Sequence, residues 1–156
     1  MLSCSPSQHK NHVTMSLVAS GTVVLVVDDD SDLRDCIADV LMMEGYDARP
    51  LRSADSAWTE VVAGTQPAAI ILDQWIAGMS SREFVRRLRA SPFADVPVLM
   101  LSGSPAARNF GTALDAVLRK PVESTTLVRA VDKLIGPKRS ARTFAETADF
   151  PMRQVA

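Results

Sequence analysis

The feature that most constrains this chain is a continuous apolar run, residues 68–72, that leads directly into Asp73. Five apolar residues in a row predict a β-strand that is buried on both faces, as in a parallel sheet. Open α/β sheets place their chemistry at the carboxyl ends of their strands, so the carboxylate that ends this run is a candidate functional group. The alternative for Asp73 by itself is a plain strand end whose side chain caps a turn or meets solvent.

Strand-like and helix-like segments alternate along the rest of the chain. Further apolar, strand-like runs occupy residues 22–27, 96–101 and 116–118, and residues 46–51 form a weaker strand in which Pro50 suggests an edge position. Apolar residues at helical spacing follow four of the runs, and these helices are expected to start at Asp30 or Ser31, Ser53, Ser80 and Ser124. Residues 104–114 make a poor helix because Pro105, Asn109 and Gly111 interrupt them. The alternation predicts an α/β fold with a doubly wound, five-stranded parallel sheet and a shortened fourth helix.

Two of the predicted helices carry specific side-chain expectations. In the helix after Ser53, the apolar face is expected to contain Ala54, Ala57, Trp58, Val61 and Val62. In the helix after Ser80, Glu83 is expected to complete a capping box with that serine. The arginines of this second helix are expected to face solvent: Arg82, Arg86, Arg87 and Arg89.

The length and composition indicate one ordinary globular domain. The chain has 156 residues, of which 47% are hydrophobic and 22% charged. We expect an N-terminal tail (1–20), a folded domain (21–136) and a C-terminal tail (137–156) that is too short for an effector domain. The net charge of −1 provides no overall field that would attract nucleic acid or an acidic membrane.

Targeting signals and cysteine use point to one compartment. No window of about 18 uncharged apolar residues is present, so membrane insertion is not expected. The two cysteines, Cys4 and Cys36, lie in a polar tail and in a helical pattern, and a structural disulfide is not expected. The chain is therefore predicted to be cytoplasmic. Either Met1 or Met15 can be the start of the protein.

Polar side chains stand at the carboxyl ends of four strand-like runs: Asp28 with Asp29, then Asp73, Ser102 and Lys120. In a parallel sheet these ends share one edge, so three carboxylates, a hydroxyl and an ammonium can converge. Two carboxylates about 4 Å apart repel by roughly 4 kcal/mol at an effective dielectric near 20. Such a cluster takes up protons or binds a cation, and oxygen ligands suit Mg²⁺ better than zinc.

A carboxylate beside Mg²⁺ can act as a nucleophile toward phosphorus and form an aspartyl phosphate. Lys120 and Ser102 can then neutralise or hydrogen-bond the phosphoryl oxygens.

These motifs resemble those of the receiver domain of two-component response regulators. The resemblance covers about residues 22–136, and four motifs carry it: residues 26–30 (VVDDD), 71–73 (ILD), 98–103 (VLMLSG) and 119–121 (RKP). It implies the flavodoxin-like strand order 2-1-3-4-5. It also implies that Asp73 is the phosphoacceptor and that Mg²⁺ is the cofactor.

The resemblance assigns further roles residue by residue. Mg²⁺ would be bound by Asp28, Asp29, Asp73 and the backbone carbonyl of Trp75. Ser102, followed by Gly103, would take the position of the switch hydroxyl, and Lys120 that of the phosphate-binding lysine. The Lys120–Pro121 peptide bond would be cis.

Three departures from the family pattern concern output rather than chemistry. The loop at residues 74–81 lacks the usual Pro and Asp-Gly, Val117 replaces the switch aromatic residue, and the interval between Ser102 and Lys120 is a few residues short. The acids and the lysine are all present, so the phosphorylation chemistry is expected to be intact. The output face and the switch mechanism are expected to differ.

The sequence therefore predicts a stand-alone receiver that is not a turnover enzyme. It would accept a phosphoryl group from a sensor histidine kinase or a histidine phosphotransfer protein. It would signal to a downstream protein target by contact or by phosphorelay, without binding nucleic acid. One alternative is a receiver-like interaction module that works without phosphorylation. Another is a Mg²⁺-dependent phosphatase, which is disfavoured because Asp73 is followed by Gln74 and Trp75 rather than by an Asp-x-Asp pair.

Overall fold

The computed structural model describes residues 21–136, without the side chains of residues 106–109. The two predicted tails, residues 1–20 and 137–156, lie outside the described residues, as do Cys4 and Met15.

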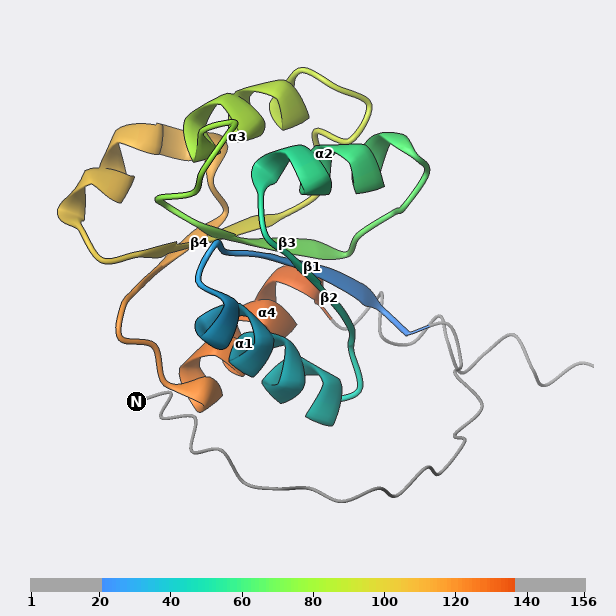
Figure 1. Ribbon diagram of the computed structural model, residues 1–156, viewed down its shortest axis with the longest axis vertical. Coiled ribbons are helices and arrows are strands. Elements are labelled where there is room, and N and C mark those ends of the chain that lie inside the picture. The colour runs from blue at the N-terminus through green and yellow to red at the C-terminus, as the bar shows by residue number, and fades with distance from the viewer. Residues whose placement is uncertain (1–20, 137–156) are drawn as a thin grey trace, which may run out of the picture.

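The core of the domain is a five-stranded parallel sheet with the order β2-β1-β3-β4-β5 (Figure 1). Its strands are β1 (Val23–Val27), β2 (Asp47–Leu51), β3 (Ala69–Asp73), β4 (Val98–Ser102) and β5 (Ala116–Arg119). This confirms the predicted fold class and strand order. Pro50, which has no N–H to donate, lies in the edge strand β2, the position in which a sheet tolerates proline. The fourth strand begins at Val98, two residues later than the sequence suggested.

Helices cover both faces of the sheet (Figure 1). The helices α1 (Ser31–Met43) and α4 (Ser124–Ile135) lie on one face. The helices α2 (Ala54–Val62) and α3 (Ser81–Arg89) lie on the other, together with the 3₁₀ helix η1 (Pro105–Ala113). Within the described residues, none of the helices combines the length and apolar character needed to cross a membrane.

The central strand β3 alternates between two separate cores. Ala69 and Ile71 belong to the core under α1 and α4, whereas Ile70 and Leu72 belong to the core under α2 and α3. All five residues of β3 are buried, which is why the sequence shows a continuous apolar run instead of an alternating one. Asp73 continues the first row of side chains beyond the end of the apolar run.

The helix starts are fixed by side-chain caps. Asp30, rather than Ser31, caps α1, and its carboxylate accepts from the backbone N–H groups of Asp32 and Leu33. Ser53 caps α2 and Ser80 caps α3, as expected. In the α3 cap, Ser80 accepts from the Glu83 N–H, but both oxygens of the Glu83 carboxylate accept from Arg86 and Arg87. Ser80 therefore caps the helix as expected, but the expectation that Glu83 reaches back to complete the capping box is wrong, because its carboxylate binds the two arginines instead.

Two helix-face expectations need correction. Val62 is 54% exposed, because it is the last residue of α2 and lies beyond the contact with the sheet. Arg89 is not on a solvated face. Its guanidinium donates to the carbonyls of Ala94, Val96 and Ala113 at 2.6–2.9 Å and to the Asp115 carboxylate at 2.7 Å. Arg89 thus ties the end of α3 to the segments before β4 and β5.

The fourth crossover is short, as the sequence predicted. It consists of η1, which is interrupted at Gly111, where φ is +58°, a conformation that glycine adopts without strain. Phe110 and Ala113 of η1 pack against the α2–α3 core, so the short segment still covers part of the sheet.

Candidate functional site

The carboxyl ends of β1 and β3 bring three carboxylates together. Asp28 follows β1, Asp73 is the last residue of β3, and these two strands are neighbours in the sheet. One oxygen each from Asp28, Asp29 and Asp73 lie within 4.8 Å of one another. Asp28 and Asp73 are buried, whereas Asp29 is exposed. The cluster is therefore open to solvent on the side of Asp29.

Lys120 adds one positive charge to this cluster. Its Nζ lies 2.8 Å from Oδ1 of Asp73 and 3.2 Å from Oδ2 of Asp28. The backbone N–H of Lys120 donates to the Ser102 carbonyl at 2.8 Å, which continues the pairing of β5 with β4 beyond the strand. The Lys120–Pro121 peptide bond is cis, as expected from the sequence.

The charges in the site perturb one another. Burial raises the pKa of the Asp28 carboxyl, and Asp73 adds to the rise, whereas the Asp30 N–H and the Lys120 ammonium oppose it. Burial by itself would lower the pKa of Lys120, but the hydrogen bond with Asp73 and the charge of Asp28 outweigh burial and raise it. Asp28 is thus a carboxylate whose charge is unfavourable where it stands, and an added cation would relieve this.

The loop after β3 is held by residues that the sequence analysis did not single out. Ser81 is buried, and its hydroxyl proton can be donated to the carbonyl of Asp73 at 2.7 Å or to that of Gln74 at 2.8 Å. The Met79 N–H donates to Asp55 Oδ2 of α2 at 3.0 Å. Ser81 occupies a position where the family pattern has glycine. A serine in place of that glycine was the one feature of the sequence that could have pointed to a side-chain hydrogen bond here.

Trp75 is the second residue after Asp73, and its backbone contacts the acidic cluster. Its backbone N–H donates to Asp73 Oδ2 at 3.3 Å, which orients the Asp73 side chain. Trp75 is 69% exposed and is the most exposed aromatic residue of the described part of the chain. The Trp75 backbone is therefore close to Asp73, while its ring is available to solvent or to a partner.

Ser102 reaches the same edge of the sheet, but its hydroxyl does not bind the carboxylates. Its Oγ donates to the side-chain oxygen of Gln74 or to the Ser104 carbonyl. Gly103, the next residue, is exposed. The predicted switch hydroxyl thus lies beside the acidic cluster with its hydrogen bond directed elsewhere.

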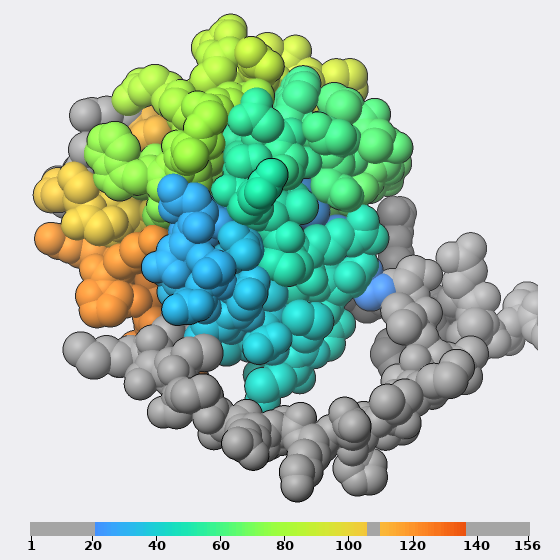
Figure 2. Space-filling view, viewed as in Figure 1, coloured from blue at the N-terminus to red at the C-terminus, as the bar shows by residue number. Residues whose placement is uncertain are grey.

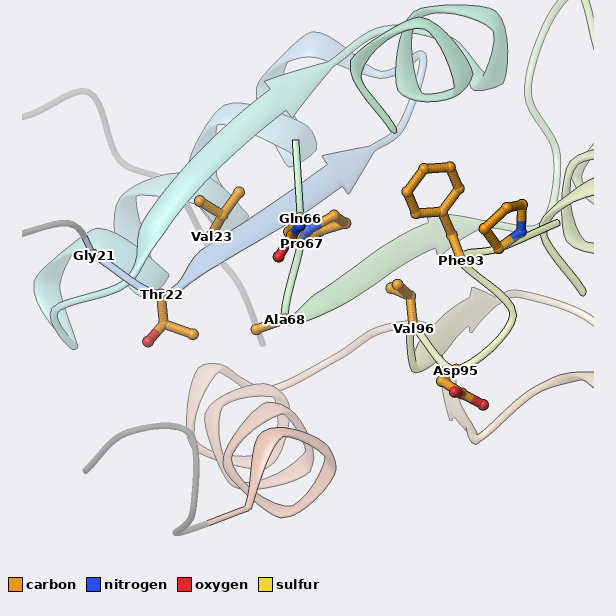
Figure 3. A pocket seen from close by; sticks show the side chains of 10 residues that line it. Gly21, Thr22, Val23, Gln66, Pro67, Ala68, Phe93, Asp95 and Val96 are labelled. Carbon is orange, nitrogen blue, oxygen red and sulfur yellow. The ribbon is translucent and has the colours of Figure 1, made fainter. Parts of the chain in front are cut away.

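The site is formed by parts of the chain that are distant in sequence. In the space-filling view, segments coloured blue, green and orange meet on one face (Figure 2). A separate hollow of about 530 Å³ lies at the other edge of the sheet, near the starts of β1 and β3 (Figure 3). It is lined by groups such as Phe93, Val96 and Pro67, and the acidic cluster is at the opposite ends of the same strands. The hollow therefore does not take part in the acidic site.

A parallel sheet in the order 2-1-3-4-5 with three acids and a lysine at its carboxyl edge defines the receiver class of signalling domains. The family model for the response regulator receiver domain matches residues 24–132. The chain belongs to this family of two-component signalling domains.

Two curated proteins are similar to most of this chain. The nitrogen assimilation regulatory protein NtrX of Azorhizobium caulinodans is 33% identical over 132 residues, which cover 79% of this chain and 28% of NtrX. The phosphate regulon transcriptional regulatory protein PhoB of Pseudomonas aeruginosa is 30% identical over 125 residues, which cover 75% of this chain and 54% of PhoB. The chain thus spans about half or less of the length of these two curated relatives.

A solved structure gives the same result for the fold. The response regulator TrrA from Thermotoga maritima, in complex with Mg²⁺-BeF, superimposes with a TM-score of 0.66 at 25% identity. The match covers 72% of this chain and 98% of TrrA.

The residues present at the acidic cluster fit a magnesium ion. Their donor atoms are carboxylate oxygens, the ligands that Mg²⁺ prefers. Three carboxylates against one ammonium leave an excess of negative charge, which a divalent cation would offset.

Proposed function

We propose that Asp73 accepts a phosphoryl group from a histidine kinase or a histidine phosphotransfer protein. The observation that carries this proposal is the position of Lys120 Nζ between Asp73 and Asp28, in a cluster that also contains Asp29. A carboxylate oxygen of Asp73 attacks phosphorus, and the phosphorus–nitrogen bond of the phosphohistidine breaks. The bonding electrons leave with the imidazole nitrogen, and the product is an aspartyl phosphate.

The neighbouring residues have distinct roles in this reaction. Asp28, Asp29, Asp73 and the Trp75 carbonyl would hold Mg²⁺, which offsets charge on the phosphoryl oxygens when it is bound. Lys120 exchanges its bond with Asp73 for one with a phosphoryl oxygen. The Trp75 N–H orients the carboxylate by its hydrogen bond to Oδ2. Ser102 and the Gly103 backbone bind the phosphoryl group from the β4 side.

The output of this domain is protein–protein contact or relay of the phosphoryl group. The net charge of −1 supports a protein partner rather than nucleic acid. NtrX and PhoB are longer regulators, so the partners of those proteins are not carried over to this chain. The protein would act as a cytoplasmic acceptor that is phosphorylated and dephosphorylated, not as an enzyme that turns over a substrate.

Labelling with a small-molecule phosphodonor tests the proposal. The protein is treated with phosphoramidate and Mg²⁺, and the adduct is located by mass spectrometry. We expect one adduct, at Asp73, that is lost in Asp73→Ala and retained in Asp32→Ala, which changes an exposed acid of α1. Equal labelling of Asp73→Ala contradicts the assignment. Absence of any adduct favours a phosphorylation-independent module, and continuous release of phosphate favours a phosphatase.

A further inference from the structure

The residue that follows the phosphoacceptor has a buried polar side chain that the proposed chemistry does not use. Gln74 is 8% exposed. Its backbone N–H donates to the Leu101 carbonyl at 3.0 Å, so the pairing of β3 with β4 continues for one residue beyond Asp73. In that register Gln74 lies beside Ser102, because Asp73 is paired with Leu101.

Strand alternation places these two side chains on the same face of the sheet. Leu72 and Met100 belong to the core under α2 and α3, and they precede Gln74 and Ser102 by two residues in their strands. Residues two apart in a strand share a face. Asp73 lies between Leu72 and Gln74 and therefore points to the other side.

The Ser102 hydroxyl both donates and accepts hydrogen bonds within this group of residues. Its Oγ accepts from the Ser104 N–H at 3.1 Å. Its proton can be donated to the Gln74 side-chain oxygen or to the Ser104 carbonyl. A hydroxyl has only one proton to donate. A phosphoryl oxygen on Asp73 must therefore compete with these acceptors for the same proton.

We propose that Gln74 is a positioning residue that holds the Ser102 hydroxyl away from the phosphorylation site and so opposes the switch to the phosphorylated conformation. This inference rests on the proposed function of Asp73. When Ser102 turns toward a phosphoryl group, the buried Gln74 oxygen loses its donor, which is unfavourable. The Gln74 backbone is held in place, because its N–H donates to the Leu101 carbonyl and its own carbonyl is one of the two acceptors that the Ser81 hydroxyl reaches.

Beryllofluoride binding to the Mg²⁺-saturated protein measures this effect. Gln74→Met keeps the length of the side chain and removes the acceptor. We expect it to tighten beryllofluoride binding about tenfold, which corresponds to about 1.4 kcal/mol. The affinity for Mg²⁺ alone should not change. Gln66→Met, the same change at an exposed glutamine near the other edge of the sheet, should have no effect.

A double-mutant cycle shows whether the effect passes through the hydroxyl. In a Ser102→Ala background, Gln74→Met should no longer change beryllofluoride affinity. The same tightening in both backgrounds would overturn the proposal, since the effect would not depend on Ser102. Weaker binding by Gln74→Met would also overturn it, because Gln74 would then be a phosphoryl ligand.

Failure of the proposed function has a different signature. If the wild-type protein neither binds beryllofluoride nor is labelled at Asp73, the phosphoacceptor role is wrong, and the role of Gln74 in switching is wrong with it. If the wild-type protein does both and Gln74→Met has wild-type affinity, only the inference about Gln74 is wrong. In the Mg²⁺-bound protein, the Ser104 amide resonance should shift in Gln74→Met and not in Gln66→Met, and an unchanged resonance would count against the contact itself.

Discussion

Replacing Asp28 by asparagine should stabilise the protein without Mg²⁺ and destabilise it relative to wild type with Mg²⁺. The oxygens of Asp28 and Asp73 lie within 4.8 Å, which corresponds to a repulsion of at least about 3.5 kcal/mol at an effective dielectric near 20. Exposed Asp29 contributes about 1 kcal/mol, as for a pair in water. The attraction of Lys120 at 3.2 Å is about 5 kcal/mol on the same scale.

Because these attractions and repulsions nearly cancel, burial decides the sign. Asp28 is 2% exposed, and burial is the largest cause of its raised pKa. We therefore expect Asp28→Asn to gain about 1 kcal/mol, or about 4 °C in melting temperature, in the presence of a chelator. With Mg²⁺ at a hundred times its dissociation constant, wild type gains about 2.7 kcal/mol that the variant lacks. The order of the two melting temperatures should then reverse.

The pH dependence has a defined sign. A folded-state pKa above the ordinary value means that the folded protein binds the Asp28 proton more tightly than the unfolded chain. The stabilisation from this proton is complete below the ordinary value of 3.8 and is lost as the pH rises through the raised folded pKa. The advantage of Asp28→Asn in chelator should therefore grow over that window and stay constant above it.

Urea unfolding in chelator and in Mg²⁺, at several pH values, measures all of these quantities. Asp39→Asn, which changes an exposed acid on α1, is the matched control and should stay within about 0.5 kcal/mol of wild type. A loss of stability by Asp28→Asn in chelator would refute the charge balance. An equal gain from Mg²⁺ in variant and wild type would refute the metal site.

Three further predictions follow from other parts of the structure. Asp29→Ala should weaken Mg²⁺ binding, which a titration followed by Trp75 fluorescence measures; unchanged affinity would exclude Asp29 as a ligand. Arg89→Met should cost about 2–3 kcal/mol in urea unfolding, because three half-buried carbonyls and a carboxylate lose a charged donor. The exposed Arg86→Met should cost much less than Arg89→Met. Beryllofluoride should change hydrogen exchange in residues 103–112, since Ser102 precedes that segment and Val117 offers no ring to move; a change confined to α4 would contradict this mechanism.

The strand ends could be predicted because each is marked in the local sequence. Asp28, Asp73 and Lys120 each follow an apolar run, and a parallel sheet leaves only one edge for them. Periodicity alone did not supply the strand order, which came from the resemblance to receivers.

Other features depend on partners that are distant in sequence. The sequence around Arg89 shows four similar arginines on one helix, and only the fold determines which of them meets the carbonyls before β4 and β5. The contact between Gln74 and Ser102 requires the register of β3 against β4, which neither strand specifies by itself. Val62 fits the helical spacing of apolar residues, but the spacing does not show where the contact of α2 with the sheet ends.

The hydrogen bond from Arg89 to the Ala113 carbonyl also restrains one end of the short fourth crossover. One end of η1 follows Ser102, while the carbonyl of Ala113 at the other end is held by Arg89. A displacement that starts at Ser102 should therefore become smaller toward Ala113, where the hydrogen bond from Arg89 restrains the backbone. Gly111 lies just ahead of this fixed point, where a change in backbone angle costs least. A partner that distinguishes the two states by contact has most to gain near the Ser102 end of η1, and least near β5.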